Sequence, residues 1–227
     1  MNWRGIEIEL CRKRVRNLNL TVYQDGRVRL SVPQRLPREE IDRFLAGREE
    51  WLHRQIQKFG SRPSRREPNF VTGERFPVWG EPRPLRVETR PGAGGVVERD
   101  GCLVMSAPPD AGPQERRRLL TEWYRRQLQS RVPAVLARWE PVVGAQATEW
   151  HARDMRTRWG SCNVRARRVW LSVRLAAWPP ECLDMVTVHE LTHLLVPNHS
   201  PRFYENLDRF FPEWRRVKQR LGAPPAG

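Results

Sequence analysis

The stretch VHELTHLLVPNHS, residues 188–200, holds three of the five histidines in this chain of 227 residues. It contains a His-Glu-x-x-His pattern. Residues four apart lie on one face of a helix, so His189 and His193 would present two imidazoles to one metal ion. Glu190 would lie beside the open side of that ion, where a general base is useful. The pattern therefore predicts a helix that carries a zinc site.

The third protein ligand of that site must come from beyond the two helical histidines, because a catalytic zinc takes three protein ligands and one water. Pro197 cannot continue a helix, and it also biases Val196 away from helical geometry. His199 follows this stop and is the expected third ligand. The spacing from His189 to His199 resembles the metzincin pattern, except that Val196 occupies the place of the turn glycine.

One alternative third ligand is a carboxylate. Glu213 lies twenty residues after His193, a spacing at which some zinc hydrolases supply a glutamate. We expect His199 instead, because a short turn bounded by proline already delivers a neutral imidazole.

The cysteines leave open a second alternative, a cysteine hydrolase. Cys162 has His151 and Asp154 near it in sequence, although proximity along the chain does not establish the thiolate–imidazole contact that this chemistry needs. The four cysteines form no Cys-x-x-Cys pair, so neither a disulfide framework nor a thiolate zinc site is indicated. Free thiols fit a reducing compartment.

Composition predicts a globular protein, with 39% hydrophobic residues. No apolar run approaches the roughly 18 residues that span a bilayer, and the N-terminal residues lack the apolar core of a signal peptide. We therefore expect a cytoplasmic protein without a membrane partner. The sequence carries no sign of the oligomeric state.

Charge alone would favour a polyanion partner, because the net charge is +15. The basic residues are 38 arginines and 3 lysines, spread over the whole chain, alongside 20 prolines and 15 glycines. That bias is typical of a GC-rich genome rather than of one phosphate-binding face. A polyanion or nucleotide thus stays an alternative partner.

Hydrophobic periodicity predicts the elements around the motif. A helix is expected between Pro37 and Gly60, a Pro- and Ser-containing linker over Gly60–Asn69, and a long helix from Pro113 that Pro133 kinks or divides. Pro179-Pro180 would open the helix of His189, and Ser200 would cap the next one. Strands are expected at 6–10, 18–22, 28–32, 76–79, 85–89, 96–98, 102–106, 148–155 and 168–173.

Several motifs together resemble one family. They are Arg158-Trp159-Gly160-Ser161-Cys162, Val188 to His193, and Asn198 to Tyr204, together with Asp25 to Val28 and Ser31 to Pro33, which resemble an opening hairpin of that family. On these residues the chain resembles the YgjP-like zinc metallopeptidase domain family, relatives of the SprT-like and wider zincin peptidases. The resemblance covers most of the chain and is loosest between about Gly60 and Ala147.

The resemblance implies an α+β fold with a zincin-like catalytic core around the His-Glu-x-x-His helix, preceded by a β-rich N-terminal region with one or two helices. We expect that region at residues 1–110 and the catalytic region at residues 111–227; the alternative is that the two form one continuous family domain. The implied site holds one Zn²⁺ on His189, His193 and His199, with Glu190 as the catalytic carboxylate.

The implied activity is hydrolysis of a peptide bond in a peptide or unfolded protein, with Glu190 as general base. A first alternative attached to the family is hydrolysis of nucleoside triphosphates such as UTP, which the positive charge would suit. A second alternative is a zinc-containing module that binds nucleic acid or protein without catalysis. Glu190 argues against the latter, since a structural zinc site has no use for a base.

Further contacts with substrate are expected around the motif. Arg158 and Trp159 either line the cleft or anchor the following turn, and Tyr204 either stabilises an oxyanion or packs against Phe203 in the core. By analogy with zincin folds, the strand Val169–Val173 would align an extended substrate as an edge strand.

Overall fold

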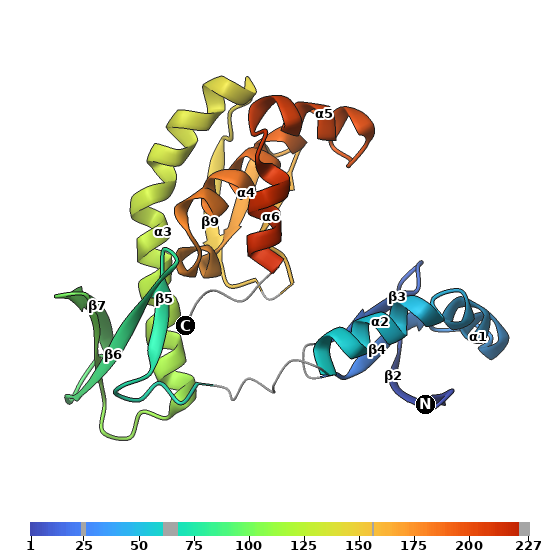
Figure 1. Ribbon diagram of the computed structural model, residues 1–227, viewed down its shortest axis with the longest axis horizontal. Helices are drawn as coiled ribbons and strands as arrows, with labels where there is room; N and C mark the ends of the chain where they lie inside the picture. The colour runs from blue at the N-terminus through green and yellow to red at the C-terminus, as the bar shows by residue number, and fades with distance from the viewer. Residues whose placement is uncertain (24–25, 61–67, 156, 223–227) are drawn as a thin grey trace. The chain divides into compact units, whose positions relative to one another are not determined.

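The computed structural model describes residues 1–23, 26–60, 68–155 and 157–222, and it shows a mixed α+β protein (Figure 1). The chain divides into two compact units, Met1–Glu67 and Pro68–Gly227. The linker expected over Gly60–Asn69 falls mostly on residues 61–67, outside the described part of the chain. Among the described helices, none combines the length and apolar character that crossing a membrane requires.

The first unit contains a four-stranded sheet in the order β1-β2-β4-β3. Alternating apolar residues bury one face of it, as the period of two predicts. The expected strands at 18–22 and 28–32 form the antiparallel pair β3–β4, and residues 24 and 25 between them lie outside the described residues. β2 pairs with β4 in parallel. The strands are β1 (Asn2–Trp3), β2 (Ile6–Lys13), β3 (Asn19–Val22) and β4 (Val28–Pro33).

Two helices follow where the sequence predicts one, namely α1 (Arg38–Ala46) and α2 (Glu49–Gly60). The break falls at Gly47, whose backbone N–H donates to the carbonyl of Arg43 at 3.1 Å. Glycine is a poor helix former, and two glutamates in the first turn of α2 suit a new helix N-terminus. Apolar residues of both helices join the sheet in one core: Ile41, Leu45 and Leu52 with Ile8, Val28, Leu30 and Val32.

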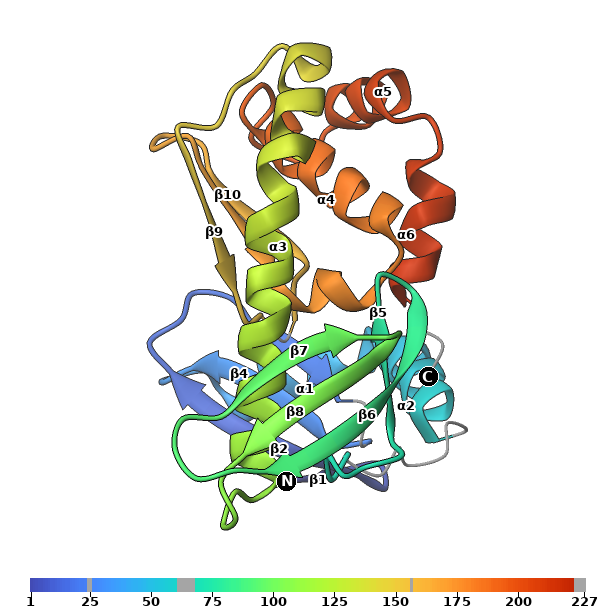
Figure 2. The same ribbon diagram turned by 90° about the vertical axis from the view of Figure 1, so that its left-hand side faces the viewer.

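The second unit begins with another four-stranded sheet, in the order β5-β6-β8-β7. Its strands lie where the sequence predicts them, and its buried face packs against the first half of α3 (Figure 2). Leu103 and Met105 of β8 meet Leu119 and Trp123 of that helix in one core. The strands are β5 (Arg75–Val78), β6 (Glu81–Thr89), β7 (Gly95–Arg99) and β8 (Cys102–Ala107).

Helix α3 runs without interruption from Pro113 to Val143. We expected Pro133 to kink or divide this helix, and the division is wrong: this proline lies inside the helix and removes one N–H donor without ending it. The first half of α3 packs on the β5–β8 sheet, and its second half contributes Leu128 and Leu136 to a different core. Residues 75–107 therefore belong to one compact unit with the residues after 110, whereas we expected the N-terminal region to extend to residue 110.

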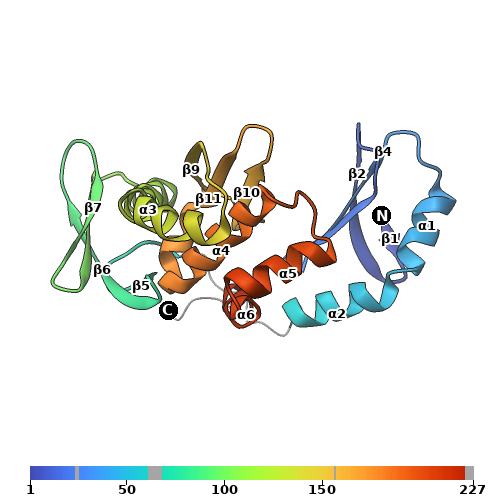
Figure 3. The ribbon, with the colours of Figure 1, turned by 90° about the horizontal axis from the view of Figure 1, so that it is seen from above.

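The rest of the second unit is a three-stranded sheet, β10-β11-β9, and the helices packed on it. Helix α4 lies between that sheet and the helices α5 and α6 (Figure 3). The elements are β9 (Glu149–Arg153), β10 (Gly160–Asn163), β11 (Arg168–Ser172), the 3₁₀ helix η1 (Val173–Ala177), α4 (Pro180–His193), α5 (Pro201–Phe210) and α6 (Trp214–Gly222).

Candidate functional site

Helix α4 carries the His-Glu-x-x-His pattern in its last turns, as the sequence predicts. It starts with Pro180 at a position where a proline costs no hydrogen bond, and it ends at His193. Most of its side chains are buried, among them Val188 and Leu191 beside the motif. Packing of these side chains in the core of the second unit therefore holds the helix, and with it the histidines, in place.

The three predicted histidines converge. One ring nitrogen from each of His189, His193 and His199 lies within 4.8 Å of the other two. Nε2 of His189 and Nε2 of His199 are 3.1 Å apart, close to the roughly 3.3 Å expected for two nitrogens on one tetrahedral zinc. Nδ1 of His193 lies 3.3 Å from the carbonyl oxygen of Val196, which leaves its Nε2 for a ligand. The donor set fits a divalent metal such as zinc.

Phe203 of α5 packs against all three histidines of this cluster. Its ring centroid lies 4.9 Å from that of His189, 4.6 Å from that of His193 and 4.8 Å from that of His199. The side chain is fully buried. One phenyl ring thus contacts all three imidazoles.

Burial sets the protonation of the groups around the cluster. It lowers the pKa of His189 to about 3, with smaller contributions from His193, His199 and Lys218, and it also lowers the pKa of His193. Both rings are therefore neutral at physiological pH, as a metal ligand must be. Burial raises the pKa of Glu190 to about 8, while the positive charge of Arg158 opposes that shift.

The loop before β10 supplies Arg158 and Trp159. Trp159 packs edge to face on Trp178, with ring centroids 4.6 Å apart, and its carbonyl accepts a hydrogen bond of 2.8 Å from the backbone N–H of Ser172. These contacts anchor the turn. Arg158 is exposed and lies close enough for its charge to act on Glu190.

Tyr204 lies between the histidine cluster and the core. Its ring is stacked near His199, at 6.2 Å, and on Trp214, at 5.6 Å, and it meets Phe203 edge to face at 5.6 Å. The ring packs on Phe203 and also borders His199, and a contact of Tyr204 with an oxyanion stays a prediction.

The two rival sites are not assembled in this way. Glu213 pairs with Arg216 and is not among the ligand atoms of the histidine cluster. Cys162 pairs with Val169 across the β10–β11 ladder, whereas His151 pairs with Trp170, the next residue of β11. Successive residues of a strand point to opposite faces, so the thiol and this imidazole lie on opposite sides of the sheet. Burial and the charge of Glu190 also raise the pKa of Cys162 to about 11, away from a reactive thiolate.

Comparison with known proteins gives one family. The family described as "YgjP-like, metallopeptidase domain" matches residues 16–223. The chain belongs to the YgjP-like metallopeptidase domain family. A domain of this type implies a divalent metal, usually zinc, and supports a metal-dependent hydrolase.

Other comparisons add little to the YgjP-like assignment. A solved structure, the metallopeptidase zymogen of Pyrococcus abyssi abylysin, matches with 20% identity over 40% of this chain and 90% of that chain. Its TM-score is 0.37, too low to carry an argument. No curated protein matches the chain.

In this YgjP-like chain, β11, the strand expected to align a substrate, is not an edge strand. β11 lies in the middle of its sheet, with β10 on one side and β9 on the other, so its backbone has no free edge. The expectation for Val169–Val173 is therefore wrong. β10 is the edge strand beside α4, and its first residue, Gly160, touches Glu190.

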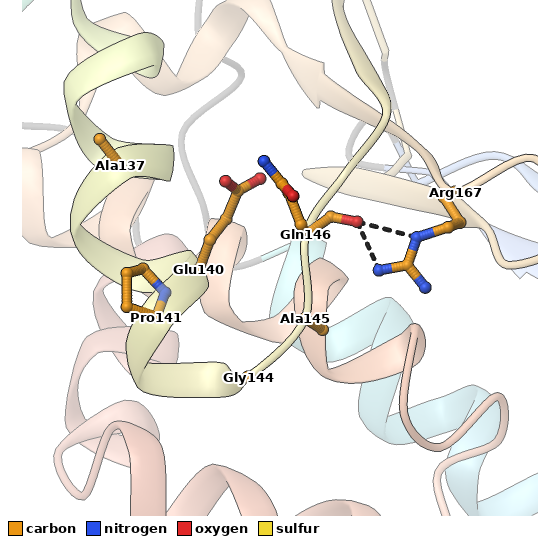
Figure 4. A pocket seen from close by; sticks show the side chains of 7 residues that line it. All are labelled: Ala137, Glu140, Pro141, Gly144, Ala145, Gln146 and Arg167. Carbon is orange, nitrogen blue, oxygen red and sulfur yellow. Dashed lines mark hydrogen bonds between the residues drawn. The ribbon is translucent and has the colours of Figure 1, made fainter.

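A cavity of about 480 Å³ lies elsewhere in the unit, where α3 ends and the chain turns toward β9 (Figure 4). Glu140, Gln146 and Arg167 line it, and Arg167 donates two hydrogen bonds to the carbonyl of Gln146 (Figure 4). None of the three converging histidines lines this cavity. The candidate chemistry therefore lies outside it.

Sequence reasoning missed two residues of the site. Phe203 was expected only as a core residue, yet it lies four positions after His199 near the start of α5, where it reaches the imidazoles. Lys218 was not considered, although its charge acts on His189 and its amine lies over the ring of Trp214. It is one of only three lysines in an arginine-rich chain, and this rarity is the one sequence signal that could have pointed to it.

Proposed function

We propose that this chain is a zinc-dependent peptidase in which His189, His193 and His199 hold the ion and Glu190 is the general base. The observation that carries the proposal is the convergence of three imidazoles at the end of the helix that also carries a buried glutamate. Membership of the YgjP-like family supports the same class of enzyme.

Each residue has a part in the proposed reaction. Zinc bound there would polarise a peptide carbonyl and acidify a water molecule. Glu190 accepts a proton from the attacking water and then donates it to the departing amine. A pKa raised by burial suits both halves of this transfer, because the group then gains and loses a proton near neutral pH.

The proposed substrate is an extended peptide or an unfolded protein. β10 is an edge strand, and a peptide that paired with it would pass beside Glu190, which touches Gly160 at the start of that strand. Backbone pairing with an edge strand gives affinity without strict sequence requirements. Arg158, exposed just before β10, would meet that peptide at one end.

The test combines metal analysis with cleavage of fluorescein-labelled casein. We expect the purified protein to contain about one zinc per chain and to cleave casein. Glu190→Gln should keep the zinc and lose at least about 100-fold in rate, whereas His193→Ala should lose the metal. His199→Ala should also lose metal. An active Glu190→Gln protein, or normal zinc binding by His199→Ala, would contradict the proposal.

A second candidate is hydrolysis of a nucleoside triphosphate. The observation that favours it is positive charge at the site: Arg158 acts on Glu190 and Lys218 acts on His189. Such charges attract phosphates. Release of phosphate or pyrophosphate from UTP, lost in Glu190→Gln and without casein cleavage, would favour this function. Zinc content without either activity would instead favour a non-catalytic binding module.

A further inference from the structure

Gly160 and Glu190 are packed so closely that any side chain at position 160 would force one of the two to shift. A Cβ atom added to Gly160 would lie 2.7 Å from Cγ and 2.8 Å from Cδ of Glu190, and closer still to Oε1. Cβ atoms in proteins essentially never approach heavy atoms within 3.0 Å. The bare backbone at the start of β10 is therefore one wall of the space that Glu190 occupies.

The backbone on the β10 side of this contact cannot retreat. Gly160 pairs with Leu171 in the antiparallel β10–β11 ladder. The preceding carbonyl, that of Trp159, accepts a 2.8 Å hydrogen bond from Ser172, and the indole of Trp159 packs on Trp178. Three independent contacts thus hold the wall in place.

The side chain of Glu190 also has little room to move away from Gly160. It lies inside α4, and only 5% of its surface is exposed. A larger residue at position 160 would push the carboxylate itself, because that is the freest part of the pair. The glycine is required for space and not for backbone conformation, since Gly160 is not among the glycines with positive φ.

We propose that Gly160 is a positioning residue for Glu190: its missing side chain fixes where the carboxylate lies. The catalytic consequence rests on the proposed function. A displacement of about 1 Å in a reacting group can cost about 100-fold in rate. Gly160→Ala should therefore reduce kcat and leave KM and the zinc content unchanged, because neither the free edge of β10 nor the three imidazoles need move.

The first experiment tests the contact without relying on catalysis. Urea unfolding midpoints are measured on chelator-treated wild type, Gly160→Ala, Glu190→Ala and the double variant. We expect Gly160→Ala to lower the midpoint in the wild-type background and to have little effect in the Glu190→Ala background, where the clashing atoms are gone. Glu190→Asp, one methylene shorter, should give an intermediate cost.

The matched control is Gly95→Ala. Gly95 is the first residue of β7, as Gly160 is of β10, and an added Cβ there would meet no described atom within 4 Å. Its midpoint should not change in either background. If Gly160→Ala fails to fold and the double variant folds, the proposal is supported. Equal losses in both backgrounds, no loss in either, or failure of both variants to fold would overturn it.

The second experiment measures casein cleavage and bound zinc on the same proteins. We expect Gly160→Ala to retain zinc and KM within about twofold and to lose about 10- to 100-fold in kcat. An unchanged kcat would overturn the positioning role even if the unfolding cycle shows the contact. If wild type cleaves no casein, the proposed function fails, and the unfolding cycle still decides whether Gly160 holds Glu190.

Discussion

Phe203 lies 4.6 Å from His193 between ring centroids, with the two planes inclined by 32°. The phenyl ring meets His189 and His199 at nearly the same distance but at a steeper angle, 72° in each case. A single buried side chain therefore determines the orientation of three rings at once. Replacing a group that orients metal ligands typically costs about 10- to 100-fold in metal affinity or activity.

We expect Phe203→Leu to weaken zinc binding by about 10- to 100-fold, because the smaller side chain leaves the imidazoles free to turn. The measurement is zinc affinity by competition with a chromophoric chelator. Phe210→Leu is the matched control: Phe210 lies on the same helix, is partly buried, and should leave the affinity unchanged. An unaltered affinity in folded Phe203→Leu would contradict the role of this ring.

Glu190 should make the metal-free protein less stable as pH rises. Its pKa is about 8 in the folded state against 4.5 for an ordinary glutamate, so the folded state holds the proton more tightly. The stability contributed by this group is complete below about pH 4.5 and is lost toward pH 8, by up to roughly 4 kcal/mol. Glu190→Gln carries no such proton.

The check is urea unfolding of chelator-treated wild type and Glu190→Gln at about pH 5 and about pH 8. The variant should gain on wild type between the two values. A constant difference would mean that the carboxylate is not buried in the folded state.

His189 should make the metal-free protein acid-sensitive. Its pKa is about 3 in the folded state against 6.5 ordinarily, so the unfolded state binds the proton first. Stability is then complete above about pH 6.5 and falls as pH drops toward 3, by about 1.4 kcal/mol per pH unit at most. Because Glu190 has the opposite dependence, the measurement belongs in the Glu190→Gln background. His189→Asn in that background should flatten the acid slope, and an unchanged slope would assign the effect to other groups.

The thiol of Cys162 should react slowly with alkylating reagents, at a rate that depends on the charge of Glu190. Burial, and then the charge of Glu190, raise its pKa to about 11. Removing the charge in Glu190→Gln should speed alkylation of Cys162 by about two- to fivefold near pH 9, measured by mass spectrometry on metal-free protein. The control is Cys182, whose pKa is raised by burial and by Glu181 instead. Cys162→Ser should keep the hydrolytic activity, and its loss would revive the cysteine-hydrolase alternative.

Much of the architecture followed from local patterns. Periodicity placed most of the strands, although not β1 or β10, and the His-Glu-x-x-His spacing with Pro197 brought together the three histidines that the structure also groups. These features depend on residues close together in sequence, where helix and strand geometry fix the outcome.

What escaped prediction depends on distant contacts. Periodicity identifies Phe203 as buried but cannot say that it is buried under imidazoles. A lone glycine such as Gly160 has no turn pattern around it, and its reason lies thirty residues away at Glu190. The order β10-β11-β9 is likewise a matter of pairing, so sequence could not tell that β11 is enclosed on both sides.

The uninterrupted helix α3 connects the two hydrophobic cores of the second unit. One helix supplies side chains to the core under the β5–β8 sheet and to the core around α4, so neither core can come apart without exposing part of the same rod. We therefore expect the sheet and the histidine-bearing layer to unfold together, so that a metal ion bound by the three histidines would also stabilise the β5–β8 sheet.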